Sequence, residues 1–99
     1  MKIIMTNLSY FVGNYNIVGN QLINNDKNIK LLISKRVQTT EKKTTFFLVN
    51  KSVSGGSYVS SLYECATNTG IEVYNFDYQK VKYNLIVDKK EQKAEIKLR

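Results

Sequence analysis

The stretch from Ile29 to Val53 limits the possible folds of this chain more than any other. From Ile29 to Val37 apolar and polar residues alternate, with an exception at Leu32, which is the period of a strand with one buried face. A polar segment follows at 38–43, and the run 46–49 is apolar throughout, which predicts a central strand covered on both faces. The stretch is therefore expected to form a β-hairpin.

The C-terminal part of the chain repeats this alternation. Every second residue from 81 to 87 is apolar, and the apolar positions resume at 94–98 after a polar turn at 89–92. A shorter alternating run at 71–78 has an aromatic face. Because the last strand carries charges on its outer side, it is expected to be a protected sheet edge.

The N-terminal part is less regular. A first strand is expected over 2–12, although residues 3–23 would also suit one long strand bent at Gly13 or Gly19. The Gly-Asn pairs at 13–14 and 19–20 favour tight turns, because both residue types accept positive φ.

Residues 57–69 fit one helix of about three turns. Ser57 is a suitable N-cap, and Gly70 suits the position just after the helix. Cys65 is expected on this helix as a small buried thiol. The apolar residues that recur at helical spacing are Tyr58, Val59, Leu62, Tyr63 and Ala66.

These elements predict a single β-rich α+β domain over residues 1–99. We expect an antiparallel sheet or small barrel of five to seven strands, with one helix (about 57–69) inserted after the central hairpin. If 3–23 is one strand, the order β-β-β-α-β-β is similar to that of the OB fold, whose small barrel commonly binds single strands. The resemblance is one of element order, and the strand at 71–78 departs from it.

Charge is segregated along the chain, whose formal net charge is +7. Residues 27–53 contain seven Lys or Arg and one acid, Glu41, whereas 54–79 contain no Lys or Arg, and 80–99 are basic again. A basic excess favours polyanionic partners, although the codon usage of an A+T-rich genome also enriches lysine.

Several kinds of chemistry are excluded by composition. The chain has no histidine and one cysteine, so Ser-His-Asp and Cys-His systems and His-based metal sites are excluded. Its carboxylates form no recognisable catalytic pair, so we expect no enzymatic activity, no cofactor and no metal. The single cysteine indicates a reducing compartment, and no run approaches membrane-spanning length; we expect a cytoplasmic protein.

Basic residues interleaved with aromatic ones indicate binding of nucleic acid, with single-stranded DNA or RNA preferred. We expect the two basic hairpins to form one face. Phe46, Phe47 and Tyr83 are needed for the core, which leaves Tyr10, Tyr15, Tyr74 and Tyr78 as freer rings. The candidate binding residues are Lys30, Lys35, Arg36, Lys42, Lys43, Lys51, Lys80, Lys82 and Tyr78.

A second hypothesis belongs to a different class. The chain is also suited to be an intracellular inhibitor or adaptor, of the type encoded by phages and mobile elements, that blocks a host nucleic-acid-processing enzyme. The acidic segment 54–79 would then mimic phosphate on the side opposite the basic strands. A homo-oligomer formed through exposed strand edges is compatible with either hypothesis.

Overall fold

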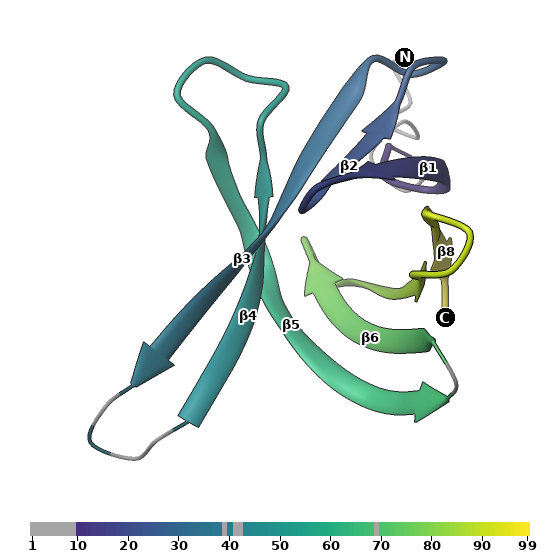
Figure 1. Ribbon diagram of the computed structural model, residues 1–99. Helices are drawn as coiled ribbons and strands as arrows, with labels where there is room; N and C mark the ends of the chain where they lie inside the picture. Colours follow the sequence, from purple (N-terminus) through teal and green to yellow (C-terminus); the bar gives the residue numbers. More distant parts are fainter. Residues whose placement is uncertain (1–9, 39, 41–42, 69) are drawn as a thin grey trace.

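The described part of the chain folds into β-strands, and in most of them polar and apolar side chains alternate. The computed structural model describes residues 10–38, 40, 43–68 and 70–99, and all regular secondary structure in these residues is β-strand (Figure 1). This part of the chain contains no helix that could cross a membrane. The strands are β1 (Gly13–Val18), β2 (Gln21–Asn24), β3 (Ile29–Gln38), β4 (Lys43–Asn50), β5 (Ser57–Asn68), β6 (Ile71–Tyr78), β7 (Val81–Asp88) and β8 (Lys93–Leu98).

The strands form a closed antiparallel barrel in which each strand pairs with the next one in sequence. The ring closes between β1 and β8, where Gly13 lies opposite Ile96 and Tyr15 opposite Ala94. Because β8 is paired on both sides, the predicted sheet edge at the last strand is wrong. A barrel of this size encloses a space that side chains can fill or that can hold one small ligand.

Apolar side chains on the inner face of the barrel form the core. The pattern expected for the C-terminal hairpin is confirmed as far as Ile96, since Tyr83, Leu85 and Ile96 are fully buried, but Leu98, expected on the same apolar face, is 49% exposed. An aromatic cluster fills the end of the barrel where β6 turns into β7. There the ring of Phe76 stacks on that of Tyr83 at 5.0 Å, and the ring of Phe11 meets both edge-on at 6.4 and 6.2 Å. Such pairs contribute about 0.5–1.5 kcal/mol each beyond the burial of their area.

The predicted helix at 57–69 is wrong, and with it the α+β class. Residues 57–68 form β5, which pairs with β4 in its first half and with β6 in its second half. A register shift in each half marks a bulge, where one strand gains a residue. Buried Val59 and Leu62 are three residues apart beside the first bulge, which imitates helical spacing. Cys65, expected to be buried, is exposed at the second.

The expected number of strands, five to seven, is also wrong, because the described residues contain eight. Residues 13–24 form two strands joined at Gly19–Asn20, where Gly19 has a φ of +65°. The tight turn expected of this Gly-Asn pair is thus confirmed. The strand expected over 2–12 falls mainly on residues 1–9, which lie outside the described residues. The order of elements therefore differs from that of the OB fold.

The central hairpin is confirmed, and it extends past the barrel wall. β3 pairs with β4 over residues 31–38, but its ladder with β2 covers only 29–32. β4 in turn pairs with β5 over 46–50. Residues 34–38 of β3 and their partners 43–47 of β4 therefore form an arm beyond the ladder with β2, at the lower left of Figure 1, and the arm is two-stranded over 36–38 and 43–45.

Candidate functional site

The outer side of β3, β4 and β5 brings aromatic and basic side chains into neighbouring positions. The register places Ser34 opposite Phe47, and Phe47 opposite Ser61. These residues point away from the barrel, because the adjacent Leu48 and Leu62 are buried inside it. We call this surface the β3–β5 outer face. It consists of Lys30, Leu32, Ser34, Arg36, Thr45, Phe47, Val49, Tyr58, Ser61 and Tyr63.

Arg36, Phe47 and Tyr58 are in contact on this face. The guanidinium carbon of Arg36 lies 5.8 Å from the centre of the Phe47 ring, within the range of a cation–π interaction. The rings of Phe47 and Tyr58 are 5.9 Å apart and inclined by 38°. Tyr58 is 60% exposed and Tyr63 66%, so both rings are available to a partner. Phe47 is partly exposed, so the expectation that 46–49 is covered on both faces is wrong.

Charge is distributed unequally around the barrel. Residues 27–63, which include β3, β4 and the first half of β5, contain seven Lys or Arg and one acid, a net charge of +6. Residues 64–99, which include the rest of β5 and β6–β8, contain seven Lys or Arg and six acids, a net charge of +1. The positive excess therefore belongs to the segment that contains β3 and β4, from which Lys30 and Arg36 lie on the outer face.

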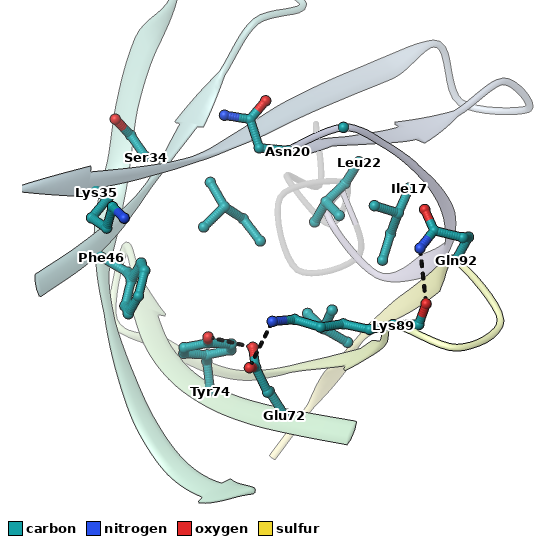
Figure 2. Close-up of a pocket in the computed structure, with 13 residues that line it drawn as sticks. Ile17, Asn20, Leu22, Ser34, Lys35, Phe46, Glu72, Tyr74, Lys89 and Gln92 are labelled. Carbon is teal, nitrogen blue, oxygen red and sulfur yellow. Dashed lines mark hydrogen bonds and ion pairs between the residues drawn. The ribbon is translucent and has the colours of Figure 1, made fainter. Parts of the chain in front are cut away.

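Some of the predicted binding residues lie together on this side. Lys30 and Arg36 belong to the outer face, and Lys51 is beside Lys30, whose carbonyl oxygen accepts a 2.7 Å hydrogen bond from the Lys51 backbone N–H. Lys35 is on the opposite surface of the arm and lines a cavity (Figure 2). The other candidates in this half are Lys42, which lies outside the described residues, and Lys43, which begins β4.

The remaining candidates lie across the barrel. Lys80 and Lys82 flank the start of β7, which is four strands away from β3 in the ring. Lys82 contacts the carboxylate of Asp77 at 3.6 Å, which offsets its charge. The ring of Tyr78 packs against that of Phe11 at 5.2 Å. The structure therefore does not bring the two basic hairpins onto one face.

Sequence reasoning missed the aromatic residues of the outer face. The sequence pattern places Phe47 in the core, and it places Tyr58 and Tyr63 on a helix. In the structure Tyr58 and Tyr63 are exposed on a strand. Of the tyrosines expected to be freer, Tyr15 and Tyr74 are buried.

A cavity of about 530 Å³ opens at the end of the barrel opposite the aromatic cluster (Figure 2). We call it the barrel mouth. The turns between β1 and β2 and between β7 and β8 form part of its rim, and their exposed residues place the opening in solvent. Its apolar walls are formed by Ile17, Leu22, Ile33, Phe46 and Val87.

The carboxylate of Glu72 organises the polar side of the mouth. Its Oε1 accepts a 2.7 Å hydrogen bond from the Tyr74 hydroxyl, and its Oε2 lies 3.0 Å from Nζ of Lys89. The hydrogen bond from Tyr74 lowers the pKa of Glu72, and Lys89 adds to this effect, while partial burial opposes it. Burial, followed by Glu72, raises the pKa of Tyr74. At neutral pH Glu72 is therefore ionised and Tyr74 is neutral.

Comparison with family models, with curated proteins and with solved structures found no match to this chain. Among the described residues, no three His, Cys, Asp or Glu side chains converge as potential ligands of a metal ion. The described residues therefore offer two candidate binding sites, the outer face and the barrel mouth.

Proposed function

We propose that the protein binds single-stranded nucleic acid through the β3–β5 outer face. The observation that carries the proposal is that the outer face combines the cations of Lys30 and Arg36 with the exposed rings of Tyr58 and Tyr63. Proteins that bind single strands combine these two features, because cations follow the phosphates while rings stack on the bases.

The geometry supports a short stacking platform flanked by cations. Phe47 and Tyr58, 5.9 Å apart, offer adjacent rings, and each base that stacks contributes about 1–3 kcal/mol. Arg36 lies against Phe47 at one end of the platform, where its guanidinium is placed to contact a phosphate. Lys30 and Lys51 continue the positive charge along the sheet.

The exposed rings favour a single strand over a duplex. Rings exposed on the surface of a sheet engage base faces, and in a duplex those faces are already stacked on one another. Tyr63, which is 66% exposed on β5, enlarges the same surface. The proposal extends to single-stranded DNA and RNA alike, because stacking and phosphate contacts are common to both.

The alternative function, inhibition of a host enzyme by mimicry of phosphate, gains no specific support. It relies on the acids of segment 54–79 being available to a partner. Glu72 of this segment is paired with Lys89 at 3.0 Å, and Asp77 is paired with Arg99 at 2.9 Å.

A titration of labelled oligonucleotides, followed by fluorescence anisotropy, tests the proposal. We expect oligo-dT and oligo-U of roughly 16 nucleotides to bind, and a duplex of equal length to bind more weakly. With Lys30, Arg36 and Lys51 as phosphate contacts, each adding about −0.7, the plot of log K against log salt should have a slope near −2. Absence of binding at low salt, or equal affinity for the duplex, would contradict the proposal.

A further inference from the structure

The barrel mouth plays no part in the proposed nucleic-acid interface, and its dimensions are those of a small-molecule site. Its volume of about 530 Å³ lies within the range of roughly 300–1,000 Å³ that is usual for such sites, and barrel mouths are a common place for them. Leu22 is fully buried at its base, and Ile33 and Phe46 are half-buried on its walls. An occupant must therefore present an apolar body.

Asn20, Ser34 and Gln92 each supply both a donor and an acceptor to the mouth, so its preference depends on the charged groups Glu72 and Lys89. Both oxygens of Glu72 are already engaged, at 2.7 Å with Tyr74 and at 3.0 Å with Lys89. The Lys89 ammonium has three N–H groups, and the contact with Glu72 needs only one of them. Figure 2 shows the Lys89 side chain inside the mouth and directed toward Glu72. This side chain is 63% exposed, so its other donors can reach a ligand.

The formal charges of the residues that line the mouth also favour a negatively charged ligand. Lys35 and Lys89 contribute two positive charges and Glu72 one negative charge, so the mouth carries a net positive charge. A negatively charged head group would accept hydrogen bonds from Lys89. A cationic head group would meet two lysines, and the charge of the one carboxylate, Glu72, is already offset by Lys89.

We propose that the barrel mouth binds one amphipathic monocarboxylate, of the class of medium-chain fatty acids. The hydrocarbon chain packs between Leu22, Ile33 and Phe46, and the carboxylate contacts the ammonium of Lys89 at the rim. Ser34 belongs to the outer face and also lines the mouth, but Arg36, Phe47 and Tyr58 do not line it, so either proposal can fail without the other.

Calorimetric titration with laurate at neutral pH, below its micellar concentration, tests the site. We expect one laurate per chain, and we expect dodecylammonium, which has the same chain and the opposite charge, to bind at least about tenfold more weakly. If laurate does not bind, or if the two amphiphiles bind equally, the proposal is overturned.

Two neighbouring lysines provide a matched pair of variants. Lys90 follows Lys89 in the same turn and is exposed, but it does not line the mouth. Lys89→Ala should weaken laurate binding about tenfold, whereas Lys90→Ala should change it less than about twofold. Equal losses in the two variants would assign laurate to the general positive charge of the chain and overturn the proposal.

A third variant tests the cavity without changing any charge. Ile33→Trp adds a ring at a half-buried wall position, where it should fill the mouth and abolish laurate binding. Thermal melting shows whether the variant is folded. A folded Ile33→Trp protein that keeps its affinity for laurate would exclude the mouth as the site.

Discussion

The two halves of the chain that follow residue 26 contain equal numbers of basic residues but differ in how these are compensated. Segments 27–63 and 64–99 have seven Lys or Arg each, yet the first has one acid and the second has six. Around β6–β8, Asp77 contacts both Lys82 at 3.6 Å and Arg99 at 2.9 Å. The positions of the carboxylates, more than the number of lysines, therefore set the difference in net charge between the two segments.

Aromatic residues divide between the two sides in a corresponding way. Phe47 of β4 and Tyr58 of β5 lie on the outer surface, whereas Tyr74, Phe76 and Tyr83 of β6 and β7 point inward and are buried. Strand register decides whether a ring stabilises the core or is available to a partner.

The largest expected effect is the difference in free energy of unfolding between removing a buried ring and removing an exposed one. Phe76→Ala removes a buried ring stacked on Tyr83, and it should lower the free energy of unfolding by about 3–5 kcal/mol. Tyr58→Ala, on the outer face, should lower it by less than about 1 kcal/mol. Urea denaturation of both variants measures the difference. Comparable losses would show that Tyr58 belongs to the core.

Tyr58, which should matter little for stability, should matter strongly for the binding of nucleic acid. Tyr58→Ala is expected to weaken the binding of oligo-dT by about 1–3 kcal/mol, because one stacked base loses its ring. Tyr58→Phe is the matched control: it keeps the ring and removes only the hydroxyl that contacts Ser61 at 3.0 Å. Its affinity should remain close to that of the parent. A loss as large as that of the alanine variant would mean that stacking is not the source of the affinity.

A smaller effect concerns the carboxylate that links β6 to the turn after β7. The pKa of Glu72 is lowered in the fold, so the ionised side chain stabilises the folded protein. This stabilisation is fully present above the unfolded pKa of about 4.3, and it is lost as the pH falls through the folded pKa. Glu72→Gln should therefore cost about 1 kcal/mol at neutral pH, and the difference from the parent should shrink below about pH 4. A melting series against pH measures it. A difference that does not change with pH would show that the charge of Glu72 is not involved.

The smallest effect is expected at the ion pairs of the compensated side. Asp77 is 57% exposed and Lys82 65%, so Asp77→Asn should change the free energy of unfolding by less than about 1 kcal/mol. A larger loss, measured by urea denaturation, would mean that these pairs hold β6 and β7 together. They would then have a structural role beyond cancelling charge.

Much of the fold follows from local alternation. The hairpins around 29–53 and 81–98 and the strand 71–78 were predictable because each repeats its pattern over several residues. The segment 57–68 was not, because its two bulges break the period of two and mimic that of a helix. Its many Ser, Tyr, Thr and Asn residues, which are poor helix formers, were the available signal.

The candidate sites depend on information that no local pattern contains. Glu72 meets Lys89 through the local pairing of β6 with β7, where Glu72 lies opposite Val87. The mouth around them also depends on the pairing of β1 with β8, because this pairing closes the barrel. The basic character of the central hairpin was visible in the sequence, but Phe47 was expected to be a core residue. Its partner Tyr58 comes from the segment whose structure was mispredicted, so the aromatic part of the outer face could not be assembled from sequence alone.

The most direct test of the account compares equal charge changes on the two sides of the barrel. Lys30→Glu with Arg36→Glu alters the outer face, and Lys80→Glu with Lys82→Glu makes the same change in net charge across the barrel. Oligo-dT affinity is measured at two salt concentrations, after melting curves have shown that both proteins are folded. We predict that the first variant binds at least about tenfold more weakly and with a shallower salt dependence, while the second stays within about threefold of the parent. Equal weakening of the two variants would contradict the account, because the total charge of the chain, and not the outer face, would then determine binding.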